Sequence, residues 1–137
     1  SRGMGVTSRA GRWGLRPTAE YLAEGDQRIT RAVQLEDPEA LRNAPAILAE
    51  EGVNAAFVGL GDLSLVTGRP PSHPENEALV DQLLATCRER GLPCGTAVGD
   101  AAAAARSRER GFSFVMVGND CSIFGRAAAD LLRPLKG

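Results

Sequence analysis

Short apolar runs alternate along this chain with longer segments in which apolar residues recur every three or four positions. The short runs predict four β-strands, at residues 29–35, 53–58, 92–98 and 112–117. The run at 53–58 is nearly continuous, which is typical of a strand covered on both faces. Strands of this kind, joined by helices, form βαβ units, so the pattern predicts an α/β fold with a parallel sheet.

The segments between the strands predict helices. Residues 74–90 are the clearest case, because Leu79, Val80, Leu83, Leu84 and Cys87 recur there at helical spacing. Further helices are expected at residues 18–25, 37–52, 100–110 and 122–132. Residues 1–14 are expected to form a loop, and so is the segment after residue 58 that contains Gly68, Pro70 and Pro71.

Four βα units are expected in these 137 residues, with no internal repeat or low-complexity linker, and this predicts a single domain over residues 1–137. A closed (β/α)8 TIM barrel needs about 250 residues. The chain is therefore expected to form about half of such a barrel. An open half-barrel leaves its two outer strands with unpaired backbone groups, so we expect a homo-oligomer or pairing with a complementary half-barrel.

Composition narrows the classes of partner. Sixteen basic and 17 acidic residues give a net charge of −1, so no broad positive field is expected and nucleic acid is not a predicted partner. The apolar runs are far shorter than the roughly 20 residues that cross a bilayer. We therefore expect no membrane association and a cytoplasmic location. Three cysteines without a C-x-x-C pair indicate neither a disulfide framework nor a zinc site.

Two carboxylates follow neighbouring strand-like runs. Glu36 comes directly after the first run, and Asp62 lies shortly after the second, in Gly59-Leu60-Gly61-Asp62-Leu63-Ser64. The C-terminal ends of parallel strands open on one face, where α/β proteins bind ligands. Two such acids could hold a divalent cation or could simply be solvated. Gln34 precedes Glu36 by two residues on the same face, and neighbouring backbone groups could satisfy its amide.

Other polar residues have weaker claims to function. His73 lies between prolines, so a structural or solvated role is expected for it. Arg9 and Arg12 could attract an anion, and Trp13 beside them could be a packing anchor. Cys94 and Cys121 are expected to fill space, as buried or semi-exposed thiols.

Several motifs, taken together and in order, resemble the HpcH/HpaI aldolases, metal-dependent class II pyruvate aldolases that act on 2-keto-3-deoxy acids and related hydroxy-keto acids. These motifs are Arg2-Gly3-Met4-Gly5, Ser8-Arg9-Ala10-Gly11-Arg12-Trp13, Glu20-Tyr21-Leu22, Gln34-Leu35-Glu36, Gly52-Val53-Asn54, Gly59-Leu60-Gly61-Asp62-Leu63-Ser64, His73-Pro74-Glu75 and Val117-Gly118-Asn119-Asp120. The resemblance covers the whole chain. It implies that the chain is the C-terminal half of an aldolase-type TIM barrel.

The resemblance also implies a site and a reaction. Glu36 and Asp62 would bind a divalent cation, Mg²⁺, Mn²⁺ or Co²⁺. The backbone amides of Gly61 and Asp62 would hold the substrate carboxylate, and Gln34 would line the pocket. The implied reaction cleaves or forms a carbon–carbon bond between a pyruvate enolate and an aldehyde, and oxaloacetate decarboxylation is related to it.

Two departures from the family pattern bear on activity. Leu60 stands where the family usually has proline. The family's histidine–aspartate base and its arginine belong to the first half of the barrel, so the catalytic residues are expected outside this chain. The alternative is a non-catalytic half-barrel that binds metal or keto acid (pyruvate, oxaloacetate or a 2-keto-3-deoxy acid), or that serves in assembly.

Overall fold

The computed structural model describes residues 5–136, with the side chains of all of these except residues 26–28 and 136. Residues 2–4 of the first motif therefore lie outside the described residues. The chain divides into two compact units, residues 1–30 and residues 31–137. The prediction of a single domain over residues 1–137 stays a prediction, and each unit is described by itself.

The first unit contains a short 3-10 helix, η1 (Arg12–Gly14), and helix α1 (Thr18–Arg28). Pro17, rather than Thr18, is the N-cap of α1, and the helix continues past Gly25. Arg16 lies between the two elements, and its guanidinium forms ion pairs with Glu20 at 3.1 Å and Glu24 at 2.5 Å, both on α1. These two glutamates are four residues apart, which places both on one face of α1.

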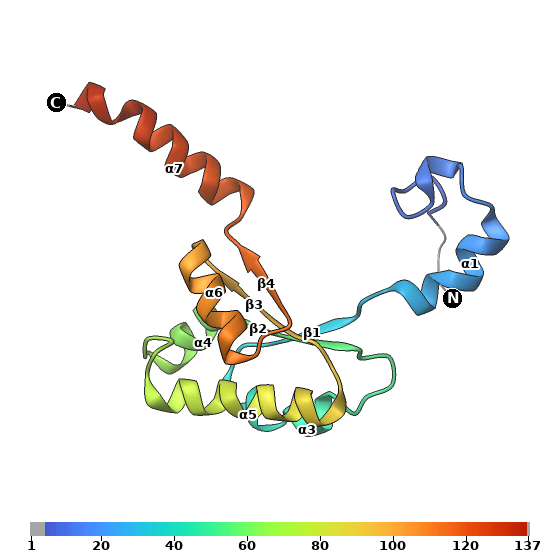
Figure 1. Ribbon diagram of the computed structural model, residues 1–137, viewed down its shortest axis with the longest axis horizontal. Helices are drawn as coiled ribbons and strands as arrows, with labels where there is room; N and C mark the ends of the chain where they lie inside the picture. The colour runs from blue at the N-terminus through green and yellow to red at the C-terminus, as the bar shows by residue number, and fades with distance from the viewer. Residues whose placement is uncertain (1–4, 137) are drawn as a thin grey trace. The chain divides into compact units, whose positions relative to one another are not determined.

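The second unit is built on a four-stranded parallel sheet in the order β1-β2-β3-β4 (Figure 1). The strands are β1 (Ala32–Leu35), β2 (Ala55–Val58), β3 (Cys94–Val98) and β4 (Phe114–Val117). Each strand lies beside the next one along the chain, as in a barrel wall. The predicted strands and their parallel arrangement are confirmed, although each strand is shorter than its apolar run.

The helices of this unit are α2 (Pro38–Arg42), α3 (Ala44–Ile47), α4 (Leu60–Thr67), α5 (Pro74–Arg90), α6 (Ala101–Arg110) and α7 (Asp120–Leu132), followed by the 3-10 helix η2 (Arg133–Lys136). Two expectations were wrong. The helix expected at residues 37–52 is two short helices that meet at Asn43, close to Pro45, whose ring disfavours a continuous helix. The segment after residue 58 is not all loop, because its first part forms α4.

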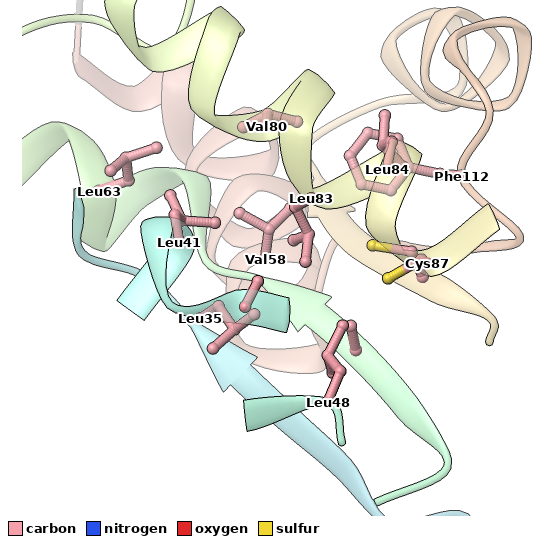
Figure 2. Packing of buried hydrophobic residues seen from close by; sticks show 13 residues of the cluster. Leu35, Leu41, Leu48, Val58, Leu63, Val80, Leu83, Leu84, Cys87 and Phe112 are labelled. Carbon is pink, nitrogen blue, oxygen red and sulfur yellow. The ribbon is translucent and has the colours of Figure 1, made fainter. Parts of the chain in front are cut away.

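The core lies between the sheet and the helices α2, α3, α4 and α5 (Figure 2). Leu41, Leu63 and Leu83 are fully buried there, each on a different helix, and Val58 meets them from β2. The apolar spacing in α5 accounts for this, because it places Val80, Leu83, Leu84 and Cys87 on one buried face.

Polar side chains fix the connection between α4 and α5. Asn76 is 1% exposed, and its Nδ2 donates to Thr67 Oγ1 and to the carbonyls of Arg69 and Pro70. His73 is the N-cap of α5, and its Nδ1 accepts from the Glu75 backbone N–H at 3.3 Å. The structural role expected for His73 is confirmed.

Within residues 5–136, no helix is both long enough and apolar enough to cross a bilayer. Large apolar side chains are nevertheless exposed on the second unit. They belong mainly to β4 and α7, at Phe114, Met116, Val117, Ile123, Phe124, Leu131 and Leu132.

Candidate functional site

The first part of the candidate site is the end of β1. Leu35 is buried in the core, so its neighbours Gln34 and Glu36 point to the opposite face of the sheet. Gln34 Nε2 donates a hydrogen bond to Glu36 Oε2 at 2.5 Å. The Gln34 amide is therefore satisfied by a side chain rather than by backbone, and it holds the Glu36 carboxylate in place.

The Glu36 side chain also lies against Gly59, at the end of β2. The two strands are in parallel register with Leu35 opposite Val58, and the Gly59 N–H donates to the Leu35 carbonyl at 3.2 Å. A Cβ at Gly59 would lie 2.7 Å from Glu36 Oε2, 3.0 Å from Glu36 Cβ and 3.2 Å from Gln34 Nε2. Glu36 and Gln34 therefore occupy space that any side chain at position 59 would take.

Asp62 and Gly61 lie in the first turn of α4, of which Gly59 is the N-cap. This corrects the expectation of a loop at these residues. The first backbone bond of the helix runs from Leu63 N–H to the Gly59 carbonyl, so the N–H groups of residues 60–62 precede it and can donate to a ligand. The Asp62 side chain is exposed, at the helix end where the dipole favours a carboxylate.

Leu60 is the first helical residue of α4 and packs against the core. Proline suits the first turn of a helix, where its missing N–H leaves no intrahelical bond unmade. Leucine at this position keeps the helix and adds one N–H to the free donors at its start.

The donor set can be compared with what different cations need. Among the residues that the structure describes, no three His, Cys, Asp or Glu side chains are grouped to hold a metal ion. Glu36 and Asp62 would therefore need water or substrate oxygens to complete a coordination shell. Mg²⁺ is commonly bound in this way, through one or two carboxylates and several waters. Zinc sites instead need three or four protein ligands.

The structure thus brings Gln34, Glu36 and Gly59 into direct contact. It places Gly61 and Asp62 in the adjoining helix turn. Gly59 was part of a motif in the sequence, but its steric role was missed. The apolar residues Leu60 and Leu63, three apart, were the available signal for α4.

The remaining sequence candidates lie elsewhere. Trp13 is 72% exposed, so the packing role considered for it is wrong. Arg9 and Arg12 are exposed in the first unit. Cys94 is buried as expected, whereas Cys121 is exposed at the start of α7 and does not fill space in the core.

Comparison with known proteins assigns the chain to a family. The family model described as HpcH/HpaI aldolase/citrate lyase matches residues 10–127. The chain belongs to this family. A hydroxypyruvate/pyruvate aldolase of Pseudomonas aeruginosa is 38% identical over an alignment of 139 positions, gaps included. The alignment covers 99% of this chain and 51% of the relative. A 5-keto-4-deoxy-D-glucarate aldolase of Citrobacter koseri is 36% identical, with 98% and 52% covered.

Solved structures of HpcH/HpaI proteins show the same architecture. A family member from Burkholderia cenocepacia has a TM-score of 0.78 at 30% identity and covers 100% of this chain and 53% of its own. An HpcH/HpaI aldolase from Desulfitobacterium hafniense has a TM-score of 0.80 at 25% identity, with 98% and 53% covered. The predicted fold, four βα units of a TIM-type barrel, is confirmed. The chain spans about half the length of the curated HpcH/HpaI relatives that it matches.

Proposed function

We propose that this chain provides the metal-binding part of an aldolase-type lyase that acts on keto acids. The reaction would cleave or form a carbon–carbon bond between a pyruvate enolate and an aldehyde. The main support is the position of Glu36. Its carboxylate accepts a hydrogen bond from Gln34 and lies against Gly59, beside the start of α4. Relatives that are named as aldolases of hydroxy-keto acids support the same substrate class.

The proposed roles follow from the chemistry of each group. Glu36 and Asp62 would hold Mg²⁺, Mn²⁺ or Co²⁺, because carboxylates and water suit such hard cations. Bound there, the cation would supply Lewis-acid chemistry toward a keto acid. The N–H groups of Gly61 and Asp62 would receive the carboxylate of pyruvate, oxaloacetate or a 2-keto-3-deoxy acid. Gly61 has no side chain to obstruct that approach, and nothing lies within 4 Å of its Cβ position.

Turnover would also need a base and a group that polarises the keto oxygen. The family resemblance assigns these to the first half of the barrel. We therefore propose that activity requires a complementary half-barrel that carries these groups, and that the chain also associates with further copies of itself. A cytoplasmic location remains part of this proposal.

The exposed apolar side chains of β4 and α7 support such pairing. β1 and β4 are the outer strands of the sheet in the described residues, and β4 carries Phe114, Met116 and Val117 at least 36% exposed. An open strand edge with apolar side chains favours association. Sedimentation velocity of the purified chain is expected to show a dimer or larger species. A stable, well-folded monomer at micromolar concentration would contradict the proposed self-association.

The activity is tested by pyruvate release from a 2-keto-3-deoxy acid, with and without Mn²⁺. The chain is assayed alone and mixed with a separately produced first half from a full-length relative. Turnover that requires both Mn²⁺ and the mixture is expected. Absence of turnover in every mixture would contradict the lyase function.

The rival function is a non-catalytic half-barrel that binds metal or keto acid, or that serves in assembly. The exposed apolar residues favour assembly in particular. Calorimetric titration with Mn²⁺ and pyruvate separates the two functions. Binding of both ligands without turnover in any mixture would support the rival. Oxaloacetate, offered in the same assay, tests for the related decarboxylation.

A further inference from the structure

Two cysteines meet in the core, outside the candidate site. Cys87 is in the last turns of α5 and Cys94 is the first residue of β3. Their side chains are 2% and 1% exposed, and both belong to the buried cluster. Figure 2 shows Cys87 at the side of the cluster where Leu84 and Phe112 lie.

The turn between α5 and β3 fixes the position of these two residues. Gly91 ends the helix in the left-handed conformation, at φ 65°, and its N–H donates to the Arg88 carbonyl. The Leu92 N–H donates to the Cys87 carbonyl at 2.9 Å. The backbone of the turn is therefore hydrogen-bonded, and this turn sets how the end of α5 lies against the start of β3.

The two thiols are unequal. The neighbouring Cys94 side chain lowers the pKa of Cys87, although burial acts in the opposite direction. The Cys87 side chain and then burial raise the pKa of Cys94. A sulfur with increased thiolate character beside a protonated thiol is the arrangement of an attacking and a resolving cysteine.

A cavity of about 130 Å³ adjoins both cysteines. Cys87 and Cys94 line it together with Arg88, Gly111 and Ser113, which are exposed. Because exposed residues form part of its wall, the cavity reaches the surface. A water molecule occupies about 30 Å³ in the liquid, so this space is large enough for a small oxidant such as hydrogen peroxide.

We propose that Cys87 and Cys94 form a reversible disulfide when the chain meets a peroxide. The Cys87 thiolate attacks one oxygen of hydrogen peroxide, the O–O bond breaks, and the departing hydroxide takes a proton to become water. The Cys94 sulfur then attacks the resulting Cys87 sulfenic acid, the S–S bond forms, and the second oxygen leaves as water. Two thiols lose two electrons, and one peroxide is reduced to two waters.

This modification would lie at the opposite end of the sheet from Glu36. Cys94 begins its strand, whereas Glu36 and Gly59 follow the last residues of theirs, and all four strands are parallel. The disulfide would tie the end of α5 to β3 without contacting the proposed metal site. The inference is therefore independent of the proposed function.

The test uses the full chain with Cys121→Ser, so that only the buried pair remains. Trypsin cuts after Arg88 and Arg90, which places the two cysteines in separate peptides, residues 43–88 and 91–106. After treatment with hydrogen peroxide and blocking of free thiols, the chain is expected to lose about 2 Da, the mass of two hydrogen atoms. The two peptides are expected to remain linked until a dithiol reductant is added.

Single substitutions separate the two roles. With Cys94→Ser, the Cys87 sulfenic acid has no resolving thiol and is expected to be trapped by dimedone. With Cys87→Ser, much less dimedone adduct is expected. The exposed Cys121 of the unsubstituted chain serves as an internal reference for oxidation. If Cys121 were oxidised at a peroxide concentration that left the peptides unlinked, the proposal would be overturned. Oxidation of each buried thiol to a separate sulfinic acid would overturn it equally.

Discussion

Replacing Glu36 by glutamine is expected to weaken Mn²⁺ binding by on the order of 100-fold or more, because losing a direct ligand should cost at least as much as losing a supporting group. Glutamine keeps the length of the side chain and can still accept the hydrogen bond from Gln34. The variant therefore removes the charge while leaving the packing on Gly59 in place. Titration calorimetry and the electron paramagnetic resonance signal of free Mn²⁺ measure the change.

Asp62→Asn provides the second arm of this experiment. If both carboxylates bind one ion, each single variant should lose most of the affinity, and the double variant should lose little more. Glu51→Gln is the matched control, because Glu51 is exposed and precedes β2 at the other end of the strand. Mn²⁺ affinity in Glu36→Gln equal to that of the control would show that Glu36 is not a ligand.

Gly59→Ala is expected to reduce Mn²⁺ affinity by about 10- to 100-fold, the range found when groups supporting a metal ligand are changed. The added Cβ would lie 2.7 Å from Glu36 Oε2, so the carboxylate must move out of its position. The backbone of Gly59 has φ −87° and ψ 87°, and a negative φ is accessible to alanine. The effect should therefore come from the lost space beside Glu36 and not from backbone strain.

Gly125→Ala is the control for this substitution. Gly125 lies within α7, and nothing is within 4 Å of its Cβ position. It should leave Mn²⁺ affinity unchanged and slightly favour the helix. Circular dichroism and thermal unfolding establish that both variants are folded. Unchanged Mn²⁺ affinity in a folded Gly59→Ala chain would mean that the position of Glu36 does not matter for the metal.

A site at the ends of β1 and β2 is consistent with a chain that covers about half of its relatives. Glu36, Gly59 and Asp62 lie at the end of β1, at the end of β2 and in the first turn of α4, so all three belong to one continuous part of the chain. The groups proposed to act on the substrate from other strands of a barrel are not part of this segment. The proposed metal binding can therefore be tested separately from the proposed turnover.

Local patterns in the sequence determined most of the secondary structure. The apolar runs predicted all four strands of the sheet, and the spacing in residues 74–90 predicted α5 almost to the residue. These predictions succeed because burial on one face imposes a periodicity that is visible in a single chain. The residues after β2 were harder, since glycine at positions 59 and 61 obscured the short helix α4.

For the candidate site too, some features could be predicted from the sequence and others depended on the tertiary structure. The order of residues after apolar strands pointed to Glu36 and Asp62, and the family resemblance added Gln34 and Gly61. Only the tertiary structure decided that Gln34 bonds to Glu36, that both lie against Gly59, and that Cys87 meets Cys94. Those contacts depend on strand register and on how a helix end packs against a strand. Neither strand register nor this packing can be predicted from the periodicity of apolar residues along the chain.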